Sequence, residues 1–121
     1  MILTRRKQGV AKHAIYATST AAIQGMTKCL ACDFGPRNIT VNCIAAGGVK
    51  TDMYSVNAPH YVADSENMSE EEIEAALSKW SPLGRVGIPE VVAGIIILLA
   101  SPLSQWLTGQ TFHVSGGALM A

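Results

Sequence analysis

Tyr16 and Thr20, which lie four residues apart, are the first pair of side chains whose spacing could support chemistry. The apolar periodicity around them predicts a helix, and side chains at positions i and i+4 share one face of a helix. A phenol and an alcohol are therefore expected at the same surface. By themselves, a tyrosine and a threonine at this spacing on a helix are typical of a structural role, so the surrounding segments must decide.

A pair of glycines, Gly47 and Gly48, lies in the middle of a second segment of interest, residues 42–54 (NCIAAGGVKTDMY). The apolar and β-branched residues before Gly47 predict a strand, and a glycine lets a cofactor approach the backbone closely. A plain turn from strand to loop is the alternative. Residues 81–90 (SPLGRVGIPE) form a third segment, whose glycines and prolines turn the chain toward another helix.

Other residues that could carry chemistry lack a suitable context. Cys29 and Cys32 have C-x-x-C spacing but fall deep inside the first predicted helix, so we expect core packing and not a redox pair. The three histidines have no metal-ligand spacing, and no second cysteine pair completes a zinc site. The sequence contains no G-x-G-x-x-G run.

Composition excludes several classes of partner. The 121 residues suffice for one small domain, and the formal net charge of zero argues against a nucleic-acid partner. The longest apolar stretch, residues 91–100, is about half of what a membrane span of about 20 residues needs. Three cysteines without framework spacing indicate a reduced, cytoplasmic protein.

The same periodicity arguments place the elements around these segments. Residues 1–12 are expected to be a loop or a residual strand end, followed by a helix over 13–34 with a buried stripe. The predicted stripe consists of Ile23, Met26, Leu30 and Phe34. A strand is predicted over 39–45, and an aperiodic, flexible loop over 54–68.

The second half of the chain is expected to hold two helices and a strand. Ser69 and Glu72 form a capping-box pattern that starts a helix, which Pro82 ends. Pro89 starts another helix through Ala100, apolar nearly all round and therefore expected to be buried on several sides. A short strand follows over 111–114. Strands alternating with helices predict an α/β fold with parallel strands, yet two strands are too few for a complete sheet.

Taken together, Tyr16, residues 42–54 and residues 81–90 resemble, in order and spacing, the C-terminal half of a short-chain dehydrogenase/reductase. The likeness spans about residues 8–121 and is greatest to fungal polyhydroxynaphthalene and versicolorin-type ketoreductases. It implies the C-terminal part of a doubly wound, Rossmann-like parallel sheet with two strands and three to four helices, a single partial domain over 1–121 that is incomplete as a domain.

The resemblance also implies roles for individual residues. Tyr16 would donate a proton to the substrate carbonyl, and Thr20 stands where the family has the lysine that holds the nicotinamide ribose and lowers the phenol pKa. Gly47, Val49 and Thr51 would contact the cofactor. The backbone of Val49 would meet the nicotinamide carboxamide, and the hydroxyl of Thr51 would meet the carboxamide or a phosphate. The substrate loop would begin with Met53 and Tyr54.

Several departures from the family pattern shape the functional expectation. Ala46 replaces a proline, Ser115 replaces an acid, and the serine expected about 12 to 14 residues before the tyrosine is absent from the window at residues 2–4. The resemblance therefore implies NADPH-dependent reduction of an aromatic polyketide-type ketone, impaired or lost in this chain. The alternatives are a non-catalytic module that pairs with itself or with a full-length paralogue, and a gene-model fragment.

Overall fold

The computed structural model describes residues 13–119 of the chain; the predicted loop at residues 1–12, with the serine window, lies outside the described residues. Four helices and two strands make up the described part, joined by short 3-10 turns. In chain order they are α1 (Ala14–Phe34), β1 (Cys43–Ala46), α2 (Tyr54–Asn57), α3 (Glu70–Ser78), α4 (Pro89–Leu99) and β2 (Thr111–Val114).

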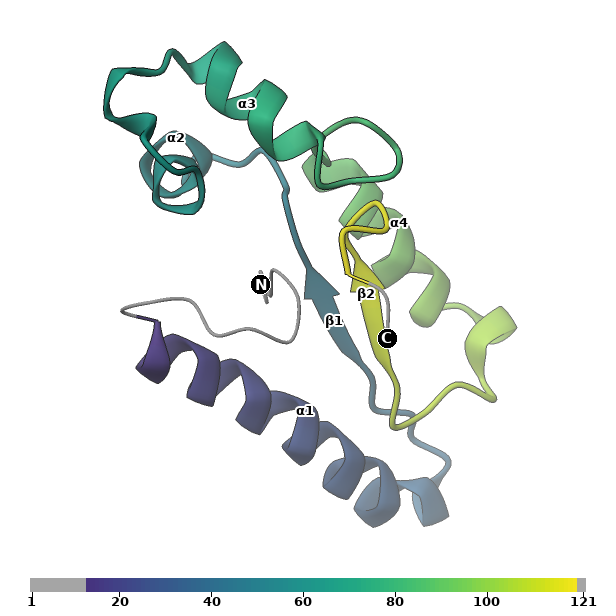
Figure 1. The fold of residues 1–121 in the computed structure, drawn as a ribbon. Coiled ribbons are helices and arrows are strands. Elements are labelled where there is room, and N and C mark those ends of the chain that lie inside the picture. The colour runs from purple at the N-terminus through teal and green to yellow at the C-terminus, as the bar shows by residue number, and fades with distance from the viewer. Residues whose placement is uncertain (1–12, 120–121) are drawn as a thin grey trace.

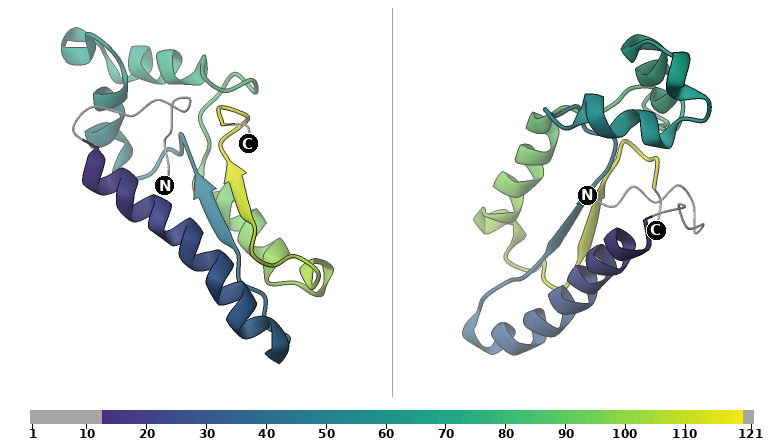
Figure 2. Two further views of the ribbon diagram at one scale, coloured as in Figure 1. Left: turned by 60° about the horizontal axis from the view of Figure 1, so that its bottom comes forward. Right: turned by 90° about the vertical axis from the view of Figure 1, so that its left-hand side faces the viewer.

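The two strands form a parallel sheet with α1 on one face and α4 on the other, as Figures 1 and 2 show. The register pairs Cys43 with Thr111 and Ala46 with Val114. Parallel strands need a long crossover, and here the crossover contains α2, α3 and α4. The α/β class, the parallel sheet and the count of two strands and four helices are confirmed.

The first strand is shorter than predicted: the strand expected over 39–45 runs only from Cys43 to Ala46. The preceding residues contact a loop before β2 instead of a strand. The amide of Val41 donates to Oγ1 of Thr108 at 3.0 Å, and Nδ2 of Asn42 donates to the Leu107 carbonyl at 2.7 Å. Side-chain bonds there supplement the backbone bond from the Gly109 amide to the Val41 carbonyl at 2.7 Å, because the partner chain becomes a strand only at Thr111.

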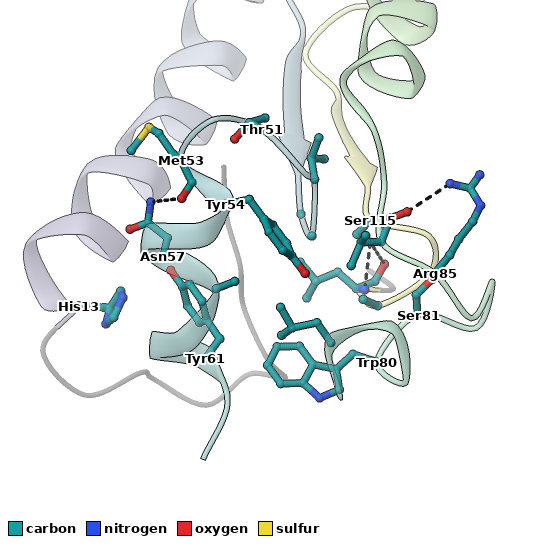
Figure 3. A pocket seen from close by; sticks show the side chains of 18 of the residues that line it. His13, Thr51, Met53, Tyr54, Asn57, Tyr61, Trp80, Ser81, Arg85 and Ser115 are labelled. Carbon is teal, nitrogen blue, oxygen red and sulfur yellow. Dashed lines mark hydrogen bonds between the residues drawn. The ribbon is translucent and has the colours of Figure 1, made fainter. Parts of the chain in front are cut away.

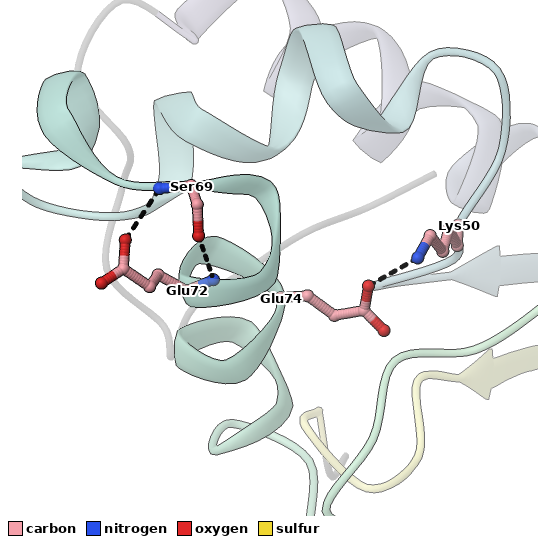
Figure 4. Close-up of polar contacts among 4 residues, drawn as sticks. All are labelled: Lys50, Ser69, Glu72 and Glu74. Carbon is pink, nitrogen blue, oxygen red and sulfur yellow. Dashed lines mark hydrogen bonds and ion pairs between the residues drawn. The ribbon is translucent and has the colours of Figure 1, made fainter.

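The helix starts and the second strand follow the local sequence signals. Oγ of Ser69 accepts the amide of Glu72 at 3.3 Å, and the Glu72 carboxylate accepts the Ser69 amide at 2.8 Å (Figure 4). This reciprocal pair is the predicted capping box, and α3 begins directly after it. The predicted start of α4 at Pro89 and the bounds of β2 are also confirmed.

The buried face of α1 differs from the predicted apolar stripe. Ile23 and Met26 are 47% and 54% exposed, whereas Thr20, Thr27 and Ala31 are buried. Small side chains let the helix backbone approach the sheet closely, and each threonine hydroxyl donates to a carbonyl in the preceding turn. The prediction was therefore wrong for Ile23 and Met26, whose side chains lie beside the contact surface.

The prediction for α4 was also wrong, because none of its residues is buried and Ile97 is 69% exposed. A two-stranded sheet covers only one side of a helix. The turn that follows continues this apolar surface, with Leu103 86% and Trp106 95% exposed. Cys29 and Cys32, expected in the core, are likewise exposed, because α1 packs on the sheet by its opposite face. Among residues 13–119, no helix combines the length and apolarity needed to cross a membrane.

Candidate functional site

A cavity of about 1000 Å³ lies at the carboxyl ends of the two parallel strands. Its wall is formed by the start of α1, residues within 47–54, α2 with the turn that follows it, the end of α3, residues within 81–86 and residues after β2 (Figure 3). Ligands of open α/β folds bind at this edge of the sheet. The topology therefore brings four distant segments of the chain to one site.

Tyr16 lies in the first turn of α1 and forms part of the cavity wall, with 38% of the residue exposed. Its ring meets the ring of His13 edge-on, with centroids 6.2 Å apart, and His13 in turn lies 5.6 Å from the ring of Tyr61. Partial burial raises the pKa of the Tyr16 phenol, and the neighbouring Tyr61 raises it further. Neither influence is a cation, so the phenol is a proton donor that ionises reluctantly.

Thr20 is on the predicted face of α1, but its hydroxyl does not reach the cavity. Oγ1 donates to the backbone carbonyls of Tyr16 and Ala17 at 3.1 and 3.0 Å, and the residue is buried. The structure thus brings Tyr16 to the cavity and leaves Thr20 behind it. A hydroxyl that is occupied by the helix backbone cannot take the place of a cation beside the phenol.

The segment after β1 brings one residue whose backbone groups are unpaired within residues 13–119, Val49, to the cavity wall. Gly47 extends the sheet, because its amide donates to the Val114 carbonyl at 3.1 Å, and Gly48 has a φ of 64° that favours glycine. Val49 then pairs with Gly87 in a parallel bridge. The N–H and C=O groups of Val49 point away from Gly87 in such a bridge, and neither has a hydrogen-bond partner among residues 13–119.

The predicted substrate loop has more structure than the sequence indicated. Thr51 and Met53 are exposed at the cavity, and the Thr51 carbonyl accepts the amide of Tyr54 at 2.8 Å. The turn leads into α2, where Nδ2 of Asn57 donates back to the Met53 carbonyl at 2.9 Å. Residues 54–67 therefore contain a short helix and two 3-10 turns. Side-chain hydrogen bonds stabilise them, and such bonds produce no helical periodicity in the sequence.

The hydroxyl of Tyr54 is buried and has no hydrogen-bond partner among residues 13–119. Figure 3 shows its ring projecting into the cavity toward Trp80. Burial raises the pKa of this phenol first, and the carboxylates of Glu74 and Glu70 raise it further. An unsatisfied buried hydroxyl costs about 1–3 kcal/mol, and native structures rarely retain one without a purpose.

Two contacts hold the walls of the cavity together. Nζ of Lys50 binds the carboxylate of Glu74 at 2.6 Å and ties the loop after β1 to α3 (Figure 4). Oγ of Ser81 donates to the Gly116 carbonyl at 2.8 Å and accepts the amide of Leu83 at 3.2 Å. The second contact anchors residues 81–90 against the chain after β2.

Several cavity residues were not singled out as site residues in the sequence, among them the aromatic or basic residues His13, Tyr61, Trp80 and Arg85. Trp80 precedes the proline predicted to end the helix that starts after Ser69, and Tyr61 fell in the segment without periodicity. The available signal was the concentration of aromatic residues in and after the predicted loop. Within the part of the chain that the structure describes, no group of His, Cys, Asp or Glu side chains could hold a metal ion.

Residues 2–118 match the sequence model of a family described as "Enoyl-(Acyl carrier protein) reductase", a branch of the short-chain dehydrogenases. The chain belongs to the short-chain dehydrogenase/reductase family. It is therefore a relative of oxidoreductases, and the expected resemblance is confirmed.

Curated members of the short-chain dehydrogenase/reductase family agree with this assignment. The chain is 47% identical over 112 residues to "Hydroxynaphthalene reductase-like protein Arp2" of Metarhizium brunneum (strain ARSEF 3297), covering 92% of this chain and 42% of that protein. It is 44% identical over 119 residues to "Tetrahydroxynaphthalene reductase" of Pyricularia oryzae (strain 70-15 / ATCC MYA-4617 / FGSC 8958), covering 98% and 42%. The chain thus spans less than half the length of these relatives.

Solved structures of the family have the same arrangement of elements. A short chain dehydrogenase family protein from Francisella tularensis subsp. tularensis SCHU S4 superposes with a TM-score of 0.82 at 32% identity, over 94% of this chain and 47% of that one. A 3-oxoacyl-[acyl-carrier protein] reductase from Brucella melitensis ATCC 23457 gives 0.73 at 36% identity, over 89% and 36%. The described fold corresponds to part of a Rossmann-like domain.

Proposed function

We propose that this chain carries the proton-donating and nicotinamide-facing part of a ketoreductase site, which reduces an aromatic polyketide-type ketone with NADPH. The observation that carries the proposal is the position of Tyr16, a protonated phenol at the wall of a cavity located at the carboxyl ends of the strands. Similarity to hydroxynaphthalene reductases supports the substrate class.

The residues after β1 fit the nicotinamide end of such a cofactor. The N–H and C=O groups of Val49, which have no partner within residues 13–119, match the carbonyl acceptor and amide donor of a carboxamide, and Thr51 is exposed at the same cavity. Gly47 and Gly48 have no side chains to obstruct that approach. When bound, the nicotinamide supplies the hydride, and the residues of this chain orient it and provide the proton.

Tyr16 would deliver its proton to the carbonyl oxygen of the substrate as the hydride arrives. The phenol pKa is raised, so the group is protonated at neutral pH but is a weak acid. In the family position of the lysine, Thr20 binds the helix backbone and supplies no charge. We therefore expect slow or absent turnover by this chain, even where substrate binds.

A titration with NADPH tests the proposal directly. Purified chain is titrated while the nicotinamide fluorescence is followed, with Thr51→Val as the variant that removes one cofactor contact. Saturable binding weakened by Thr51→Val supports the proposal. No binding at millimolar NADPH would contradict the nicotinamide-facing role. NADPH oxidation with a naphthol-type ketone, abolished by Tyr16→Phe, would instead overturn the expected loss of activity.

Association with a second protein chain is the alternative function, and the exposed apolar surfaces favour it. Ile23 and Met26 on α1, and Ile97 and Trp106 at the far face of the sheet, are all at least 47% exposed. Such surfaces are commonly covered by a partner. The proposed partners are a second copy of this chain or a full-length paralogue, and the three free cysteines fit a cytoplasmic location. Light scattering over micromolar concentrations distinguishes a monomer from an oligomer.

A further inference from the structure

The buried hydroxyl of Tyr54 is an unused hydrogen-bonding group inside the cavity. Its oxygen is shielded from solvent, and in the part of the chain that the structure describes it bonds to no other group. Two other hydroxyls of the cavity wall are engaged by the protein: Ser81 donates to the Gly116 carbonyl, and Ser115 accepts the amide of Leu119 at 3.1 Å. Because a buried hydroxyl is normally satisfied, the group missing beside Tyr54 is one that a ligand can supply.

Tyr54 and Tyr16 come from different elements of the cavity wall. Tyr16 belongs to the first turn of α1, whereas Tyr54 begins α2 after the loop that follows β1. The space beside Tyr54 is bordered by the aromatic rings of Tyr61 and Trp80 (Figure 3). Flat aromatic rings pack well against such rings. The cavity therefore offers a phenol at each of two walls and aromatic surface near one of them.

The chemistry of the Tyr54 site favours a donor. The carboxylates of Glu70 and Glu74 disfavour a phenolate, and burial acts in the same direction. Tyr54 thus retains its proton, and its O–H group is an unused donor in the wall of the cavity. An acceptor oxygen on the ligand, either a phenolic hydroxyl or a quinone-type carbonyl, would accept a hydrogen bond from this O–H group.

We propose that Tyr54 binds a second oxygen of the substrate, remote from the carbonyl that faces Tyr16. This inference rests on the proposed function for the ketone at Tyr16, and it narrows the substrate class to planar aromatic ketones that carry at least one further ring oxygen. Tyr54 is then a specificity-determining residue. Its hydroxyl forms a hydrogen bond with a polyoxygenated ring and stays unsatisfied when a mono-oxygenated ring binds.

Binding of matched naphthols to the purified chain tests this inference without NADPH. The probes are 1-naphthol, with one oxygen, and 1,3- and 1,6-dihydroxynaphthalene, with a second oxygen at different distances. Affinities are measured by calorimetry or ligand-observed NMR for the wild type, Tyr54→Phe and the control Tyr61→Phe. We expect at least one diol to bind the wild type about tenfold tighter than 1-naphthol, the effect of one hydrogen bond to a buried group.

Tyr54→Phe should reduce that preference to less than about twofold, whereas Tyr61→Phe should keep it. The unfolding midpoint of Tyr54→Phe should equal or exceed that of the wild type, because the lost hydroxyl has no hydrogen-bond partner within residues 13–119. A clear fall in that midpoint would assign the hydroxyl a structural role and overturn the inference.

An equal preference in the wild type and Tyr54→Phe, or no binding of any probe by the wild type, would also overturn it. The proposed reductase function fails separately, through the NADPH titration. A chain that selects diols through Tyr54 yet binds no NADPH would keep the specificity site and lose the ketoreductase role.

Discussion

Replacing Thr20 by lysine is expected to lower the pKa of Tyr16 by about 2–3 units. Side chains at i and i+4 of a helix are about 5–6 Å apart at their Cβ atoms. A cation about 4–6 Å from a phenolate, at an effective dielectric near 20, stabilises it by about 3–4 kcal/mol. One pKa unit corresponds to about 1.4 kcal/mol. In the wild type, burial raises the pKa of Tyr16, and Thr20 contributes no positive charge to oppose it.

Thr27→Lys is a matched control for this substitution. Thr27 lies on the same face of α1, is also buried, and donates its hydroxyl to the Ile23 carbonyl at 2.8 Å. Both variants therefore lose a buried threonine and its bond to the helix backbone. At about 1.5 Å per residue, however, position 27 is about 16 Å from Tyr16 along the helix, where a charge has little effect.

The measurement is a pH titration of the tyrosine ζ-carbons by NMR, with the Tyr16 signal assigned from Tyr16→Phe. Thr20→Lys should titrate at a lower pH than the wild type, and Thr27→Lys should not. If the two lysine variants give the same Tyr16 pKa, the reasoning that Thr20 removes the controlling charge is refuted.

The catalytic consequence requires a complete domain. Residues 13–121 are joined to the N-terminal half of an active homologue, which supplies its own serine and glycine-rich loop. The chimera with Thr20→Lys should reduce a naphthol-type ketone faster than the chimera with Thr20, by roughly 10²-fold or more, the scale of general acid–base catalysis. Thr20→Lys alone should not rescue the isolated chain. Equal rates in the two chimeras would contradict the central role of this position.

Three further predictions concern stability and association. Ser69→Ala should lower the free energy of unfolding by about 1 kcal/mol, and the added loss in Ser69→Ala/Glu72→Ala should be smaller than additive because the two residues cap one another; additive losses in denaturant titrations would contradict the cap. Glu74 raises the pKa of Lys50, so the stabilisation by this exposed pair should be present below the ordinary lysine pKa and disappear as the pH rises through the raised value. Lys50→Met should abolish that dependence, and an unchanged pH profile of the melting temperature would count against the pair. Met26→Lys should reduce self-association of the chain measured by light scattering, since Met26 is 54% exposed, and an unaltered mass would show that α1 is not the contact.

Local sequence determined most of the secondary structure of this protein. The capping box at Ser69 and Glu72 and the proline at position 89 act through groups within one helical turn, so their effect is visible in the sequence. The order of helices and strands followed from the same kind of signal. The family motifs around Tyr16 and Gly47 likewise identified the segments that meet at the cavity, because their spacing along the chain is itself the signal.

Tertiary structure decided which surfaces are covered and which polar groups have partners. The helical period of α1 allows either its threonine and alanine stripe or the neighbouring Ile23 and Met26 to face the sheet, and close packing selected the smaller side chains. The unpaired backbone of Val49 depends on a bridge to Gly87, and the unsatisfied hydroxyl of Tyr54 depends on where four distant segments meet. Such features arise from contacts between residues far apart in the chain, and no local pattern encodes them.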